Sequence, residues 1–258
     1  MANIPEITLQ TVPMLQIGSI GISNSVLATL VVTLLLAGVG AFLIRNLRVV
    51  PTRLQVGIEG IIEFFMGQLT SAWGSEERAK KYLPVIFTLF FFLLVANQFS
   101  ILPLVSSITA DGVQALRTPT SDLALPVAMA IAMIGSAHVI AFIAHPLNHL
   151  GNYFKFFQFL KVRSFSGFLN TCLEVFLGLL DIIGELAKIV SLSCRLFGNI
   201  FAGEVMITVI TGLAAFIVPM PFIFLSIFSG VVQAFVFALL SLQFMAMIVK
   251  SAEPEAAA

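Results

Sequence analysis

The sequence predicts an all-α, polytopic membrane protein with five membrane helices and one amphipathic interfacial helix. Three observations support this prediction: the composition, the length of the apolar runs and the placement of the basic residues. Hydrophobic residues make up 59% of the 258 positions and charged residues only 10%, with a mean hydropathy of +1.06. Water-soluble domains carry about 25% charged residues, so an ordinary soluble domain is excluded. Thirteen basic and thirteen acidic residues cancel, which gives no indication of a nucleic-acid partner.

Five apolar runs are long enough to cross a bilayer, which requires about 20 mostly apolar residues. They cover residues 26–44, 82–105, 121–144, 167–211 and 216–249. The last two are too long for one upright crossing, so these helices must tilt steeply or protrude. We expect the five helices to form a single membrane domain over residues 1–258.

Residues 53–73, between the first two runs, are apolar with one polar side. On a helical wheel, four polar residues of this segment fall within about 80° of one another. They are Gln55, Glu59, Glu63 and Thr70. This pattern predicts an amphipathic helix that lies at the inner membrane interface.

Basic residues alternate between rich and poor connections. Six lie between the first two runs, Arg117 alone follows the second, and three follow the third. The turn near Pro219 has none, and Lys250 closes the last run. Because cytoplasmic connections are rich in Lys and Arg, we expect an outside N-terminus and an inside C-terminus.

The fourth run carries a stripe of ionisable and polar residues. One charge at mid-membrane costs at least about 2.5–3.5 kcal/mol, so these side chains must face protein, one another or water. Two alternatives remain for the first four: a salt-bridged stripe, with Glu185 and Lys188 as one pair, or the lining of a wet vestibule. The stripe consists of Glu174, Asp181, Glu185, Lys188, Arg195, Asn199 and Glu204.

Arg195 is the exceptional member of the stripe. No carboxylate stands three or four residues away on either side, and neither Lys188 nor Asn199 can neutralise it. An unpaired guanidinium in an apolar segment implies an anionic partner, and the other runs hold no acid in their interiors. We infer a carboxylate on another subunit. Because Arg does not readily lose its proton, it acts by lowering the pKa of that carboxylate.

Further polar residues indicate water paths. Glu204 lies half a turn away from the Arg195 face, so it suggests a separate path opened by Gly198 and Gly203. The last run carries a second polar face. Small residues on such a face are typical of close helix packing, but Gln233 is too large for that role and is predicted to face a channel. This face consists of Ser226, Ser229, Gly230 and Gln233.

Three histidines, His138, His145 and His149, fall on one face of the third run and its extension. We expect His138 to titrate in a water path and the other two to be interfacial. No Cys or acid accompanies them and Pro146 interrupts the helix, so no metal is expected. The chain has no phosphate loop and no dinucleotide-binding turn. We therefore expect no cofactor, no direct nucleotide binding and no self-contained active site.

Residues 191–204, SLSCRLFGNIFAGE, resemble the signature of subunit a of F-type ATP synthases. Segments 50–55, 83–90, 119–123 and 233–237 resemble the same family, with Glu59, Asn97 and the 102–103 pair Leu-Pro. The resemblance extends over about residues 50–243.

The resemblance implies that Arg195 is the stator arginine that faces the carboxylate of a rotating c-ring. It implies that Asn199, Glu204 and Gln233 line two offset half-channels, that Lys188 lies on the inner path, and that the last two runs form a steeply tilted hairpin around the ring. Many bacterial relatives have His at the position of Ser226. Ser226 cannot titrate, so water around Glu204, Ser226 and Gln233 would serve in place of that histidine.

The expected function is that of an ion-translocating stator that couples proton transport to ATP synthesis in an energy-coupling membrane, a bacterial inner membrane. Its partners would be the c-ring, b-type subunits of the peripheral stalk and the lipid bilayer. Two alternatives are a secondary ion-coupled transporter and a purely structural assembly subunit. The sequence leaves open whether the coupling ion is a proton or sodium, and whether Asp181, Glu185 and Lys188 line the inner path.

Overall fold

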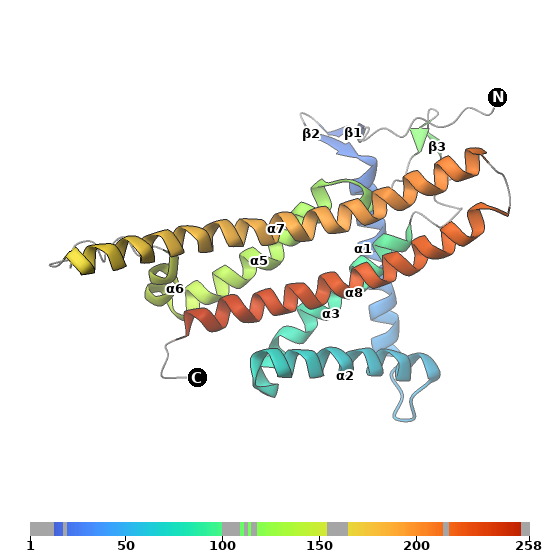
Figure 1. Ribbon diagram of the computed structural model, residues 1–258. Helices are drawn as coiled ribbons and strands as arrows, with labels where there is room; N and C mark the ends of the chain where they lie inside the picture. The colour runs from blue at the N-terminus through green and yellow to red at the C-terminus, as the bar shows by residue number, and fades with distance from the viewer. Residues whose placement is uncertain are drawn as a thin grey trace. The chain divides into compact units, whose positions relative to one another are not determined.

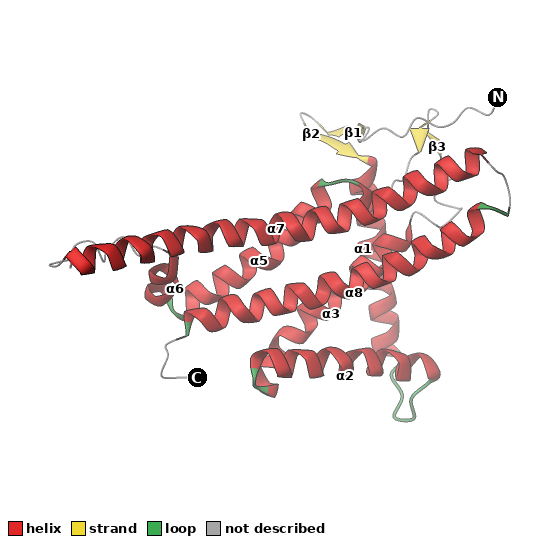
Figure 2. Ribbon diagram, viewed as in Figure 1, coloured by secondary structure: helices red, strands yellow, loops and turns green. Residues whose placement is uncertain are grey.

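The computed structural model describes residues 13–17, 20–99, 109–110, 113–114, 118–153, 165–213 and 217–253, with side-chain surroundings for 23–99, 118–153, 171–213 and 217–253. Helices dominate these residues (Figure 2). The helices are α1 (Asn24–Arg45), α2 (Arg53–Trp73), α3 (Glu76–Gln98), the 3-10 helix η2 (Pro119–Ser121), α5 (Ala124–Ala144), α6 (Pro146–Tyr153), α7 (Phe165–Leu213) and α8 (Pro219–Ala252).

The expected all-helical, polytopic architecture is confirmed, with two small additions. Strand β1 (Pro13–Ile17) pairs antiparallel with β2 (Ile20–Ser23), and β3 (Thr109–Ala110) pairs with β4 (Val113–Gln114). The short helix α6 was not expected either. The expected end of the second run beyond residue 99, and the connecting Arg117, Lys155, Lys161 and Arg163, lie outside the described residues.

Four helices of the described chain are long and apolar enough to cross a membrane: α1, α3, α5 and α8. They correspond to four of the five expected runs. The fourth expected run forms α7, a helix of 49 residues that is not among those four and carries six charged side chains. The two longest helices, α7 and α8, are drawn in Figure 1.

The chain divides into two compact units. The first contains residues 1–126 and 194–239, and the second contains residues 127–193 and 240–258. Helices α7 and α8 are each divided between the units: α7 between residues 193 and 194, and α8 between residues 239 and 240.

An aromatic cluster forms the core of the first unit. Helix α2 buries Phe65, Leu69 and Trp73, which recur every four residues on one face. The Phe65 ring lies 5.2 Å from the ring of Phe90 in α3 and 6.1 Å from that of Phe235 in α8, between centroids. On the polar side of α2, Glu59 and Glu63 are exposed and Gln55 and Thr70 are half-buried. The helix predicted over residues 53–73 is confirmed as a helix.

Helix α2 begins and ends at residues suited to those positions. The Thr52 hydroxyl accepts a hydrogen bond from the Gln55 amide, 3.4 Å away, and so caps the N-terminus. Gly74 ends the helix with φ 71°, a left-handed conformation that glycine adopts without steric cost. These two signals explain why the predicted bounds 53–73 match the helix.

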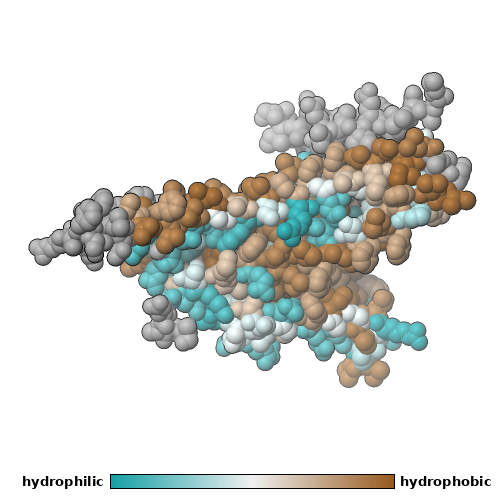
Figure 3. Space-filling view, viewed as in Figure 1, coloured by the Kyte–Doolittle hydropathy of each residue, from teal (hydrophilic) through white to brown (hydrophobic). Residues whose placement is uncertain are grey.

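Helix α1 buries little of its apolar surface. Ala28 and Val32 pack against Ala96 and Phe99, near the end of α3. Farther along α1, the side chains of Leu34 and Phe42 remain 71% and 67% exposed. Much of the face drawn in Figure 3 is likewise apolar. In water this exposure would be unfavourable by about 25 cal/mol per Å² of apolar area, so lipid is the solvent that such a surface requires.

In the second unit, α6 packs closely against α7. Proline at the first position of α6 suits a helix start, because the missing N–H would have no partner there. A Cβ atom built on Gly178 of α7 would lie only 2.8 Å from the carbonyl oxygen of Tyr153. Glycine at this position therefore allows the end of α6 to lie beside α7 (Figure 1).

Candidate functional site

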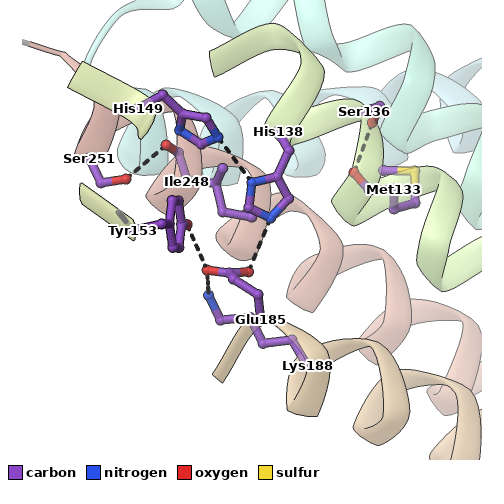
Figure 4. Close-up of polar contacts among 9 residues, drawn as sticks. All are labelled: Met133, Ser136, His138, His149, Tyr153, Glu185, Lys188, Ile248 and Ser251. Carbon is purple, nitrogen blue, oxygen red and sulfur yellow. Dashed lines mark hydrogen bonds and ion pairs between the residues drawn. The ribbon is translucent and has the colours of Figure 1, made fainter. Parts of the chain in front are cut away.

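Glu185 of α7 lies at the centre of a polar cluster in the second unit (Figure 4). Its Oε1 accepts hydrogen bonds from Lys188 Nζ at 2.7 Å and from the Tyr153 hydroxyl at 3.2 Å. Its Oε2 lies 3.5 Å from His138 Nε2, in ion-pair range when His138 is protonated. The predicted pairing of Glu185 with Lys188 is confirmed.

An interruption between helices α5 and α6 brings His149 into this cluster. His149 Nε2 lies 3.2 Å from His138 Nδ1, although the two residues are 11 apart in sequence. In one continuous helix that separation would place them about 16 Å apart along the axis. Pro146 interrupts the helix, and α6 returns His149 to His138. The sequence suggested that His149 is interfacial, but its side chain is buried inside this unit.

The surroundings perturb both titratable groups of α6. Burial, followed by the charge of the neighbouring His138, holds the pKa of His149 below its ordinary value. Burial, followed by the Glu185 carboxylate, raises the pKa of the Tyr153 hydroxyl. The Tyr153 hydroxyl therefore stays protonated and donates a hydrogen bond to Glu185, and His149 tends to remain neutral.

A cavity of about 280 Å³ adjoins the cluster. One water molecule occupies about 30 Å³ of liquid, so the cavity has room for several. Polar residues of three helices line it: Asn152, Tyr153, Asp181, Glu185, Lys188 and Ser251. For Glu185 and Lys188, the predicted ion pair is therefore present, and it borders a cavity with room for water.

Arg195, in the first unit, faces away from its own unit. Its neighbours Leu192, Leu196 and Ile200 are buried, whereas Arg195 is exposed. Within the part of the chain that the structure describes, its guanidinium forms no ion pair with a carboxylate, consistent with the expectation from the sequence.

Asn199 and Ser229 bind each other reciprocally in the first unit. The Ser229 hydroxyl donates to Asn199 Oδ1 at 2.6 Å, and Asn199 Nδ2 donates to the Ser229 carbonyl at 3.3 Å. One turn farther along α7, a Cβ atom built on Gly203 would lie 2.9 Å from the Ser226 hydroxyl. The polar faces predicted for α7 and α8 therefore meet, with Glu204 half-buried beside Gly203.

Two side-chain amides of α3 also reach α8, and no sequence pattern predicts these contacts. Asn97 Nδ2 donates to the Gly230 carbonyl and Gln98 Nε2 to the Ile227 carbonyl, each at 3.0 Å. Nearby, the side chain of Gln233 is only 7% exposed, and its Nε2 has no hydrogen-bond partner among the described residues. A buried amide donor without a partner costs about 1–3 kcal/mol, which a water molecule or an ion path would relieve.

The predicted site residues thus divide between the two units. Arg195, Asn199, Glu204, Ser226 and Gln233 lie in the first unit, and His138, Asp181, Glu185 and Lys188 lie in the second. Sequence reasoning missed Tyr153, His149, Asn97 and Gln98 as contacts of these groups. Tyr153 is one of only two tyrosines in the chain, the one signal that would have singled it out.

Polar side chains gathered between apolar helices, beside a cavity large enough for water, are typical of membrane proteins that move ions. The family model of the ATP synthase A chain matches residues 26–246. The chain belongs to this family. It is accordingly a multi-pass membrane subunit of an F-type ATP synthase and part of its ion-translocating stator.

Individual relatives agree with this assignment. "ATP synthase subunit a 2" of Bradyrhizobium sp. is 34% identical over 88% of this chain and 89% of its own length. "ATP synthase subunit a" of Moorella thermoacetica is 34% identical over 92% and 96%. "ATP synthase subunit a, sodium ion specific" of Propionigenium modestum is 36% identical over 86% and 72%.

Proposed function

We propose that Arg195 works against a carboxylate carried by the rotating c-ring and separates two half-channels that load and unload that carboxylate. The observation that carries the proposal is the exposed guanidinium, which lacks a carboxylate partner within the described residues. A charge in the hydrocarbon costs at least about 2.5–3.5 kcal/mol. A carboxylate presented by another subunit offsets that cost.

The residues around Arg195 support a close approach by such a partner. Ser191, Cys194, Gly198 and Ala202 of α7 are exposed and small. In membranes, small residues at a surface allow the backbones of two helices to come close together. Arg195 is the one long side chain of this patch, so it can reach a carboxylate that passes over its neighbours.

The two polar groups supply the half-channels of this proposal. The inner one contains Asp181, Glu185 and Lys188 with the cavity that they line, and His138 beside Glu185. The outer one contains Asn199, Glu204, Ser226 and Gln233. The spacing of the basic residues supports an outside N-terminus and an inside C-terminus.

In this arrangement α7 crosses the membrane as the fourth of five membrane helices, α7 and α8 are the tilted hairpin of one membrane domain, and α2 lies at the inner interface. The remaining partners would be b-type subunits of the peripheral stalk.

The mechanism follows from the charge of Arg195. An ion enters one half-channel, binds the ring carboxylate, travels nearly a full turn and leaves through the other. Arg195 lowers the proton affinity of any carboxylate beside it, so an ion does not pass directly between the half-channels. Each elementary charge that crosses 100 mV supplies about 2.3 kcal/mol, so several must cross for each ATP made.

Arg195→Lys tests this proposal, with Arg45→Lys as the matched control at an exposed helix end. We expect Arg195→Lys to abolish ATP-driven ion pumping by the assembled enzyme in vesicles, because Lys loses both the guanidinium geometry and a permanent charge. Glu204→Gln should slow pumping without preventing assembly. Near-normal pumping by Arg195→Lys would refute the proposal and favour a structural assembly role. Comparing proton with sodium uptake in the same vesicles identifies the coupling ion.

A further inference from the structure

The inner cluster contains one continuous line of titratable groups. It runs from His149 through His138 to Glu185, with separations of 3.2 Å and 3.5 Å (Figure 4). The other carboxylate oxygen of Glu185 is already bound by Lys188 and Tyr153. Oε2 has no hydrogen-bond partner among the described residues, so it is the oxygen left to exchange a proton with His138.

We propose that His138, held by His149 and facing Glu185, is a proton-exchange site that communicates with the inner cavity through Glu185, which lines it. The proposal rests on the function proposed above and names the proton as the ion that this path carries. In it, His138 Nδ1–H donates to His149 Nε2, which leaves a lone pair on His138 Nε2. A hydronium ion in the cavity gives its proton to the Glu185 carboxylate and becomes water, and Glu185 Oε2 passes the proton to this lone pair. The product is a His138 imidazolium paired with the Glu185 carboxylate, and the reverse step returns the proton to water.

The groups around His138 favour one stored proton at a time. His149 and Tyr153 of α6 and Asp181, Glu185 and Lys188 of α7 are the titratable groups at this site. Helix α8 contributes Met247, Ile248 and Ser251, none of which titrates. The lowered pKa of His149 keeps that ring neutral, so it accepts the His138 hydrogen bond and does not compete for the proton.

The chemistry of the site favours protons over sodium. Free protons are scarce at neutral pH, so a path that carries them benefits from a group that titrates there, and histidine is that group.

The test uses the assembled enzyme in inside-out vesicles, where ATP-driven pumping draws protons through the inner path. His138→Gln removes the imidazole ring, and His145→Gln is the matched control, because no described side-chain hydrogen bond or ion pair involves His145. We expect the pumping rate of His138→Gln to equal that of the unchanged enzyme at about pH 6. At about pH 8, where protons are scarce, the rate should be about tenfold lower. Free imidazole should restore the rate, and His145→Gln should follow the unchanged enzyme.

His149 is a positioning residue in this proposal, and two variants separate its role from simple packing. His149→Gln keeps an acceptor for the His138 hydrogen bond and should retain most of the pumping. His149→Leu removes the acceptor and should reproduce the His138→Gln profile, including the rescue by imidazole. The amount of this chain in the purified complex confirms that each variant assembles.

Three results would overturn the proposal. They are a His138→Gln rate equal to that of the unchanged enzyme at every pH, a loss at every pH that imidazole does not restore, and ATP-driven uptake of sodium in place of protons.

Arg195→Ala is included in the same series. If it stops pumping while His138→Gln does not change the rate, only the exchange site fails. If Arg195→Ala pumps normally, the function proposed above fails.

Discussion

The ion pair between Glu185 and Lys188 has a counterpart of equal length elsewhere in the chain, and the two should respond differently to the same substitution. Both have an N–O distance of 2.7 Å. The side chains of Glu185 and Lys188 are 16% and 18% exposed, whereas those of Glu76 and Lys80 are 67% and 64% exposed. We expect Glu185→Gln to destabilise the protein and Glu76→Gln to have no measurable effect.

The difference follows from burial. Removing one partner of a fully buried pair costs about 3–5 kcal/mol, because the remaining charge is left without compensation. Lys188 keeps some access to the cavity, so about 2 kcal/mol is a reasonable expectation for Glu185→Gln. For a chain of this size, that corresponds to a fall of about 4–8 °C in the unfolding midpoint. Water screens the exposed pair, so its loss changes little.

The assay is the apparent thermal midpoint of the detergent-solubilised complex at one fixed heating rate, since membrane complexes seldom unfold reversibly. The double variant Glu185→Gln with Lys188→Met removes both charges and should be more stable than Glu185→Gln alone. If Glu185→Gln and Glu76→Gln shift the midpoint equally, or if the double variant is the least stable of all, the argument from an uncompensated charge is wrong.

Two further predictions concern close packing and pH. Gly178→Ala places a methyl group 2.8 Å from the backbone carbonyl of Tyr153 and should cost about 1–3 kcal/mol, because backbone cannot rotate away. Gly203→Ala meets the rotatable Ser226 hydroxyl at a similar 2.9 Å and should change the thermal midpoint much less, and equal losses would contradict this reasoning. The pKa of His149 is lowered in the folded state, so the unfolded chain binds more protons as the pH falls through about 6.5, and stability falls with it. The thermal midpoint should therefore be lower at about pH 5.5 than at about pH 8, and the difference should be smaller for His149→Gln. An equal difference in that variant would assign the effect to another group.

Sequence patterns predicted the helices well, because each depends on a local run of apolar residues. The expected bounds 26–44 became Asn24–Arg45, and 53–73 matched α2. The second run was expected to begin at residue 82, but α3 begins at Glu76, because the charged first turn is helical without being apolar. Local spacing also predicted the pairing of Glu185 with Lys188, which lie three residues apart on one helix face.

Contacts that depend on tertiary packing could not be predicted in this way. Asn97 and Gly230 are 133 positions apart, and no local pattern relates them. For His149, wheel arithmetic assumed a continuous helix, and the break at Pro146 changed both its direction and its partner. The cluster around Glu185 therefore becomes complete only when the fold places α6 against α7.

The small exposed residues around Arg195 have a mechanical consequence. Large side chains that interlock would give a partner a few deep resting angles, and each step between them would require those contacts to break. A flank of Ser191, Cys194, Gly198 and Ala202 offers no such ridges. In the function proposed above, the free energy of the partner would then vary with its rotation angle mainly through the approach of its carboxylate to the guanidinium. The torque would be limited by that one electrostatic contact, and interlocking side chains would add little resistance.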